Sequence, residues 1–344
     1  MNRRAIVKSL SGLAAFAQFV RAQDRAARQP AQVGGQGRGR GPSMPIPPPT
    51  RQASYSGRLK PGVVAMSFRG ELESGQLTYE DIVKISADLG LEGLDMTSYY
   101  VPPLLKFPPG IASQVVSEMV RQTPANPSSQ WLASLRSTAY RNNFQIYTIG
   151  TPVKMSHETL ELRQKEVAFG KKWVDMADRL GAGHIRVFAG SIPKGATEEQ
   201  AVAWAVEVYK QILDYAAEKG IFVGVEDDDE LTRTSAQIFN ILKLAGDHPF
   251  SRIGLDVGNF RRDGYNEVAK CAPYAHCTHI KTSMSTPDGG REPADWVKLF
   301  GILANNGFRG YVSMEIETND NPVPKFAAEE IRVARMFSGQ PVPA

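Results

Sequence analysis

Several features that would direct a protein toward a membrane or a redox function are missing from this chain of 344 residues. No run of about 18 or more consecutive apolar residues occurs, so we expect no membrane span. The only two cysteines are Cys271 and Cys277, and no Cys-x-x-Cys pair is present, which argues against zinc-ribbon and thioredoxin-like motifs. We interpret both as small buried residues near one strand rather than as a disulfide.

Negative charge is almost absent from the first 60 residues and dominates the rest. Residues 1–60 carry 11 Lys or Arg and a single acid, Asp24, whereas residues 61–344 hold 29 basic and 35 acidic residues, a net charge of −6. The basic balance of the whole chain, +4, therefore belongs to the N-terminal segment. Because the remainder lacks a positive field, we expect no nucleic-acid partner.

The first 60 residues have the pattern of an export signal followed by a linker. Arg3-Arg4 precedes a short apolar stretch and a small-residue cleavage site at Ala22, so residues 1–22 resemble a twin-arginine signal peptide. Residues 23–60 are rich in Pro, Gly and Arg, and we expect a disordered linker. The predicted partner is the twin-arginine export machinery, and the predicted location is periplasmic or secreted, without a stable membrane anchor.

From residue 61 onward, short β-branched runs alternate with helical patterns, as in a parallel α/β fold. Helices are expected over 158–180 and 198–219, each followed by a glycine stop. Eight strands are expected at 62–68, 93–96, 144–149, 184–189, 221–226, 252–256, 278–281 and 311–316. Without a Gly-x-Gly-x-x-Gly motif opening a helix, this alternation predicts a single-domain (β/α)8 TIM barrel over 61–344. The second unit, 97–143, is longer than a loop and one helix require, which is typical of a functional insertion.

Four side chains of types that commonly bind metals fall near the carboxyl ends of the last four expected strands. Active sites of such barrels lie at these strand ends. The four residues are Glu226, Asp256, His279 and Glu315. Three carboxylates and an imidazole suit one divalent ion such as Mn²⁺, Mg²⁺, Co²⁺ or Zn²⁺. Each residue alone has an ordinary explanation as a cap, an ion-pair partner or a core histidine. Four on consecutive strands favour a metal site.

Motifs around these residues resemble a known family. The segments include Gly-Leu-Asp256-Val-Gly-Asn259-Phe, Thr-His279-Ile-Lys281 and Gly-Tyr-Val-Ser-Met-Glu315. They look like the sugar phosphate isomerase/epimerase family with a xylose-isomerase-like TIM barrel, over about residues 61–338. The resemblance implies that Glu226, Asp256, His279 and Glu315 hold one divalent metal. It also implies that Glu226 and Glu315 act as the catalytic acid/base pair.

The chain departs from this family at two positions. Many relatives carry a second histidine three residues after the strand-six aspartate, where this chain has Asn259. Ketose epimerases tend to place a substrate-binding arginine six residues after the strand-seven histidine, where this chain has Ser285. Arg186, Lys281 and Asn259 are the predicted substrate-binding residues, although the first two could equally be ordinary charged residues at the rim.

The resemblance implies a metal-dependent isomerase or epimerase that acts on a sugar or related polyol through an enediolate. A lyase or dehydratase acting on a keto-sugar or keto-glycoside would use the same intermediate. A non-catalytic periplasmic sugar-binding protein is a further alternative, although it would not need both glutamates. Apurinic endonucleases share the barrel but bind several zinc ions through many histidines, and this chain has five in all. The sequence leaves the sugar and the reaction type open.

Overall fold

A computed structural model describes residues 58–102, 113–122, 125–316 and 323–340 of the chain. The expected signal peptide and almost all of the expected linker lie outside the described residues. Eight parallel strands form a closed barrel in the order β1-β10-β7-β6-β5-β4-β3-β2, which confirms the predicted TIM barrel. The strands are β1 (Leu59–Val64), β2 (Gly93–Thr97), β3 (Gln145–Lys154), β4 (His184–Phe188), β5 (Phe222–Glu226), β6 (Ser251–Asp256), β7 (Ala275–Ile280) and β10 (Gly310–Met314).

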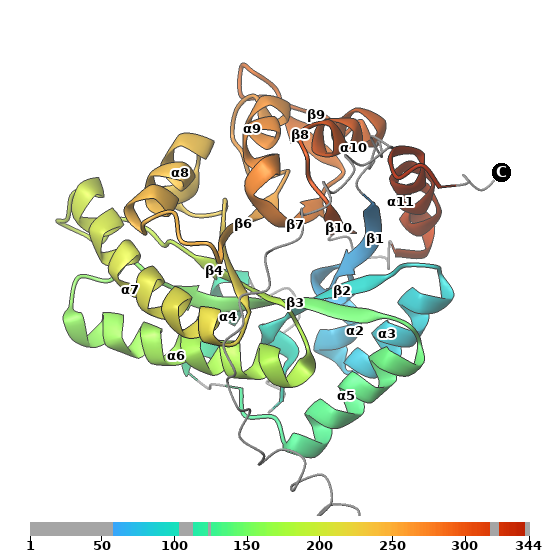
Figure 1. Ribbon diagram of the computed structural model, residues 1–344, viewed down its shortest axis with the longest axis horizontal. Helices are drawn as coiled ribbons and strands as arrows, with labels where there is room; N and C mark the ends of the chain where they lie inside the picture. The colour runs from blue at the N-terminus through green and yellow to red at the C-terminus, as the bar shows by residue number, and fades with distance from the viewer. Residues whose placement is uncertain (1–57, 103–112, 123–124, 317–322, 341–344) are drawn as a thin grey trace, which may run out of the picture. The chain divides into compact units, whose positions relative to one another are not determined.

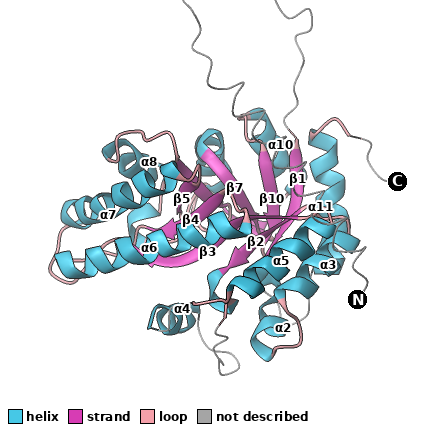
Figure 2. Cartoon of the chain, turned by 60° about the horizontal axis from the view of Figure 1, so that its bottom comes forward, coloured by secondary structure: helices cyan, strands magenta, loops and turns pink. Residues whose placement is uncertain are grey.

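Helices surround the strands on the outside of the barrel (Figures 1 and 2). They are α2 (Arg69–Ser74), α3 (Tyr79–Asp88), α4 (Ser113–Gln122), α5 (Ser129–Arg141), α6 (Leu160–Leu180), α7 (Glu198–Glu218), α8 (Ser235–Leu244), α9 (Gly264–Cys271), α10 (Trp296–Asn305) and α11 (Val323–Phe337). A short antiparallel hairpin of β8 (Ser283–Ser285) and β9 (Arg291–Pro293) follows β7. No helix among the described residues is both long and apolar enough to cross a membrane.

Local sequence explains where the two longest helices begin and end. The Thr159 side chain accepts a hydrogen bond from Leu162 N at the start of α6, and Gly181 ends this helix with a positive φ of 79°. Thr197 and Gln200 form a capping box at the start of α7. Such caps satisfy backbone groups that have no partner inside the helix. The apolar faces of α6 and α7 then pack against the outside of the barrel, through residues such as Trp173 and Tyr209.

The strand boundaries differ from the prediction because pairing, rather than apolar runs, determines where a strand ends. β1 begins at Leu59, two residues before the expected start of the barrel, and stops at Val64. Residues 59–63 of β1 pair with residues 310–314 of β10, and the apolar run that follows forms a 3₁₀ turn, Ala65–Phe68. Glu315 and Lys281 likewise lie just after their strands. The barrel thereby presents their side chains at its mouth.

The described part of the long second unit contains two helices. After β2, a 3₁₀ turn (Ser98–Tyr100) leads into the segment that contains α4 and α5. Within the described part, Arg121 of α4 donates to the carbonyl oxygen of Pro152 at 2.7 Å and pairs with Glu166 of α6. Both partners are largely buried. The described part of the insertion is therefore held against β3 and α6 near the carboxyl end of β3.

Candidate metal and substrate site

The four predicted ligands meet around one nitrogen atom at the mouth of the barrel. His279 Nδ1 lies 2.8 Å from Glu315 Oε2, 3.7 Å from Glu226 Oε1 and 3.8 Å from Asp256 Oδ2. The strand register explains this convergence, because Asp256 stands directly beside His279 across the β6–β7 pair. Strands β5, β6, β7 and β10 are also consecutive in the barrel, so their ends share one side of its rim.

The donor set fits a divalent cation. His279 is fully buried, and the carboxylates of Glu226 and Asp256 are only 4% and 2% exposed. The candidate ligand atoms of Glu226, Asp256 and His279 all lie within 4.8 Å of one another. His279 Nδ1 and Glu315 Oε2 are both buried and face each other, without a well-aligned hydrogen bond to the described residues. Several buried carboxylates in one place are costly unless their charge is fully balanced, and a metal ion would satisfy them together with the imidazole nitrogen.

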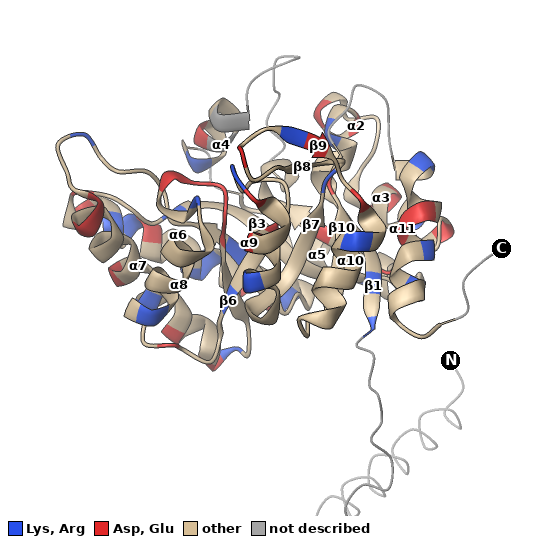
Figure 3. Cartoon of the chain, turned by 90° about the horizontal axis from the view of Figure 1, so that it is seen from above, with Lys and Arg blue, Asp and Glu red and all other residues tan. Residues whose placement is uncertain are grey.

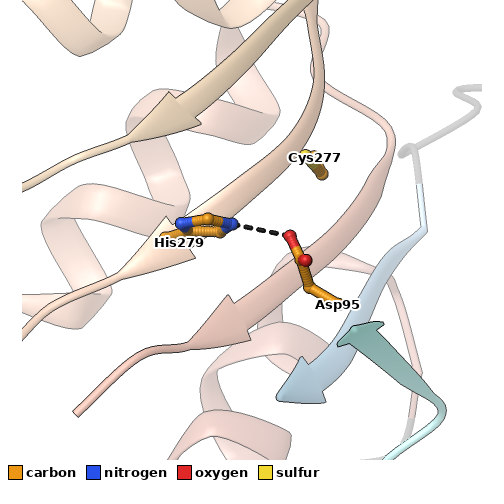
Figure 4. Close-up of side chains that lie close together, drawn as sticks. All are labelled: Asp95, Cys277 and His279. Atoms are coloured by element: carbon orange, nitrogen blue, oxygen red, sulfur yellow. Dashed lines mark hydrogen bonds and ion pairs between the residues drawn. The ribbon is translucent and has the colours of Figure 1, made fainter. Parts of the chain in front are cut away.

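Asp95 holds the opposite edge of the His279 ring. Its Oδ2 atom lies 2.7 Å from His279 Nε2, and both side chains are fully buried (Figure 4). This contact leaves Nδ1 as the nitrogen that faces the carboxylates. In many metal sites, a carboxylate that is not itself a ligand orients the histidine ring in the same way. Sequence reasoning did not identify Asp95 as a partner of His279. The available signal was an acid within the otherwise apolar and small segment Gly93–Thr97.

A second grouping, Asp95 with Cys277 and His279, also satisfies metal-ligand spacing. Figure 4 shows Cys277 beside this pair without a bond to either residue. Burial raises the pKa of the Cys277 thiol to about 12, and the charge of Asp95 adds to the effect. Three carboxylates converge on the other ring nitrogen of His279, so the geometry favours the carboxylate side of the ring. Both cysteines are buried and free, as the sequence predicted.

Two cations compensate part of the negative charge. Lys281 Nζ lies 3.1 Å from Asp256 Oδ2 and 3.0 Å from Glu315 Oε2. Arg186, from β4, pairs with Glu226 and lies 3.7 Å from Asp95 Oδ1. Its side chain crosses the barrel interior over Gly150, where an added Cβ would come within 2.3 Å of the guanidinium. The absence of a side chain on β3 thus makes room for Arg186.

The two glutamates have opposite electrostatic environments. Burial raises the pKa of Glu226 to about 8, against the lowering effects of Arg186 and His279. Burial also disfavours the charged form of Glu315, but Lys281 and His279 outweigh it and lower the pKa of that carboxyl group. Paired carboxyl groups with separated pKa values are typical of acid/base sites.

A cavity of about 240 Å³ opens above these side chains. The sequence-predicted residues Glu226, Asp256, Glu315, Arg186, Lys281 and Asn259 all line it, whereas His279 lies buried behind them. The remaining lining residues were not predicted: Met66, Thr97, Tyr99, Gly150, Thr151, Phe188 and Asp228. Four of them belong to the strands β2, β3 and β4, and the other three follow β1, β2 and β5. Because they are spread over five strand units, no local motif marked them. Figure 3 shows residues 226–230 as an unbroken acidic stretch.

Comparison with known proteins supports the fold. The Xylose isomerase-like TIM barrel family matches residues 111–336. No curated protein matches the sequence significantly. Among solved structures, D-psicose 3-epimerase with D-tagatose from Clostridium cellulolyticum H10 is 16% identical, with a TM-score of 0.58 over 82% of this chain and 96% of that one.

Two further structures share the barrel. The probable 3-DHS dehydratase AsbF from Bacillus anthracis is 16% identical, with a TM-score of 0.57 over 81% of this chain and 98% of that one. The IOLI protein with a binding zinc atom is 14% identical, with a TM-score of 0.55 over 81% and 96%. At these identities the likeness concerns the fold. The family match covers most of the barrel, and the chain therefore belongs to the Xylose isomerase-like TIM barrel family.

Proposed function

We propose that this protein is a divalent-metal-dependent isomerase or epimerase of a sugar or related polyol. The observation that carries the proposal is the convergence of three carboxylates on the buried His279 Nδ1 atom at the floor of a polar cavity. Glu226, Asp256, His279 and Glu315 would hold the ion. Structural neighbours include sugar epimerases and a zinc-binding protein, which supports the same class.

The proposed acid/base pair is Glu226 and Glu315, which would act on opposite sides of a bound substrate. They end β5 and follow β10, three strands apart around the barrel, and both line the cavity. We propose that one removes a proton from the carbon next to a carbonyl and that the other returns a proton. A bound divalent ion would polarise the carbonyl oxygen and stabilise the negative charge that develops there.

The remaining polar residues of the cavity would position the substrate. Lys281 and Arg186 are charged donors, and Asn259 offers both a donor and an acceptor at the same wall. Hydroxyl groups of a polyol can accept from the cations and donate to the carboxylates. If one residue removes the proton and the other returns one, the configuration at the carbon inverts. If a single residue does both, the carbonyl group migrates.

Elimination is the second candidate, because it begins with the same proton abstraction and a dehydratase shares this fold. The decisive experiment is metal analysis of the purified protein, followed by incubation with keto sugars and keto-glycosides in deuterated water. Deuterium incorporation at the α-carbon with a rearranged sugar would support an isomerase or epimerase. Loss of water or of a glycosidic group would identify a lyase. Sugar binding without exchange across the panel would instead identify a binding protein.

A further inference from the structure

Five consecutive acids, residues 226–230, end β5 and begin the loop that follows it. Three of them accept hydrogen bonds from backbone N–H groups of neighbouring segments. Asp227 Oδ1 accepts a hydrogen bond from Asp256 N at 2.7 Å, and Asp229 Oδ2 accepts one from Gly190 N at 2.8 Å. Glu230 Oε2 accepts from Ile192 N at 3.0 Å. These contacts fasten the loop after β5 to the ends of β4 and β6.

Asp228 differs from its neighbours. Its side chain lines the cavity and has no direct hydrogen bond or ion pair with the described residues, although the charges of Arg186 and Lys281 act on it. A carboxylate held at a substrate cavity by an anchored loop, yet free of direct protein partners, is available to a ligand. The hydrogen bonds of Asp227 and Asp229 to the backbone position the loop, and thereby Asp228, on both sides of it.

The cations of the cavity are already paired. Lys281 contacts Asp256 and Glu315, and Arg186 contacts Glu226 and Asp95. Within the described residues, four carboxylates and two cationic side chains line the cavity, so that one divalent ion would balance them. A phosphate monoester adds about 1.5 to 2 negative charges at neutral pH. The described lining offers it no unpaired cation.

At the position that often binds phosphate in TIM barrels, the described basic side chains are already engaged by other groups. Such sites commonly use the loops after the seventh and eighth barrel strands. After β7, Lys281 is engaged by two carboxylates, and Arg291 of β9 donates to Gly258 O and Ser283 O. The sequence between β10 and α11, residues 315–322, contains three acids and no Lys or Arg.

We propose that Asp228 is a substrate-binding residue that restricts this site to uncharged polyhydroxy compounds and rejects their phosphate esters. Its carboxylate would accept hydrogen bonds from substrate hydroxyl groups and repel an anionic group in the same place. The inference rests on the proposed function for the location of the substrate, and it adds the charge class that the substrate must have.

The test compares matched pairs of free keto sugars and their phosphate monoesters, for example D-fructose and its 6-phosphate, by calorimetry and by turnover on the metal-loaded protein. We expect the free sugar to bind at least about tenfold more tightly than its ester, as expected for repulsion between like charges in a partly shielded site. Asp228→Asn should tighten binding of the ester by roughly 3- to 30-fold. Asp228→Lys should tighten it further.

Asp214→Asn is the matched control, because it removes the same charge from a 74% exposed side chain of α7 and should leave both affinities unchanged. Equal or tighter binding of the esters by the natural protein, or unchanged selectivity in both Asp228 variants, would overturn the inference. So would the absence of binding by every free sugar. Turnover confined to the esters would overturn this inference and leave the proposed function standing. Selective binding of free sugars without exchange would overturn the proposed function and leave this inference standing.

Discussion

At the residue scale, the paired glutamates carry the proposed chemistry. Glu226→Gln and Glu315→Gln each keep a coordinating oxygen but remove the base. A general base contributes roughly 100- to 10,000-fold, so turnover should fall by at least about 100-fold in each variant. The measurement is solvent deuterium exchange at the α-carbon of the substrate. Full exchange in both variants would transfer the role of base to another residue.

Asp95 should tune metal affinity through His279, which it contacts at 2.7 Å. Asp95→Asn keeps the shape of the side chain but removes the charge that supports the buried imidazole. Loss of such an outer partner typically lowers metal affinity by about 10- to 100-fold, and we expect a decrease in this range by competition with a chelating dye. Cys277→Ala is the control and should retain the metal. Loss of metal in the cysteine variant alone would instead favour the Asp95, Cys277 and His279 grouping.

At the element scale, the capping box of α7 illustrates how local sequence stabilises the frame around the site. Thr197 Oγ1 accepts from Gln200 N, and Gln200 Oε1 accepts from Thr197 N. Thr197→Ala should reduce the free energy of unfolding by about 1 kcal/mol, measured by urea denaturation, because the helix start loses a backbone partner. Thr197→Ser keeps the hydroxyl and should cost less. Equal losses in both variants would show that the cap is not the cause.

Elements of this kind were predictable because their signals are local. The helices expected at 158–180 and 198–219 are α6 and α7 within two residues, since caps and glycine stops lie in the sequence itself. Strand ends were less accurate. The run after Val64 is as apolar as β1, yet only residues 59–63 find partners on β10. The neighbouring strand therefore determined the boundary.

At the scale of the whole molecule, the half-buried His276 should make folding sensitive to acid. The His276 ring packs 4.5 Å from His184 and 4.9 Å from Phe222, between ring centroids. Burial lowers the pKa of His276 to about 4, and the charge of Arg252 adds to the effect. In the unfolded chain a histidine titrates near 6.5. Above that pH both states are neutral, so the histidine places no penalty on folding there.

As the pH falls from about 6.5 to about 4, the unfolded state takes up a proton that the folded state does not, so stability is lost in this window. The loss from this residue should reach at most roughly 3 kcal/mol. His276→Phe keeps the ring contacts and should flatten the pH dependence of urea unfolding. His248→Gln, in the loop before β6, serves as the control and should leave it unchanged. An unchanged slope in the His276 variant would contradict this assignment.

Export is a further prediction for the whole chain, and it concerns residues outside the described part. We propose a periplasmic or secreted product cleaved near Ala22, on the basis of Arg3-Arg4 and the short apolar stretch that follows. Replacing both arginines by lysine should trap the precursor in the cytoplasm, as followed by cell fractionation. Continued export of that variant would exclude the twin-arginine route.

The sequence by itself determined the barrel and the meeting of Glu226, Asp256, His279 and Glu315, because the ends of consecutive parallel strands must share one rim. The tertiary structure decided which partner each of these residues has. Asp95 reaches His279 and Arg186 reaches Glu226 between strands far apart in the sequence. Arg186 and Glu226 lie on the paired strands β4 and β5, whereas Asp95 of β2 and His279 of β7 meet only because the barrel closes. Side-chain direction inside the barrel decides both contacts. Asp228 differs from the acids beside it for the same reason, since the anchored loop alone determines which of them faces the cavity.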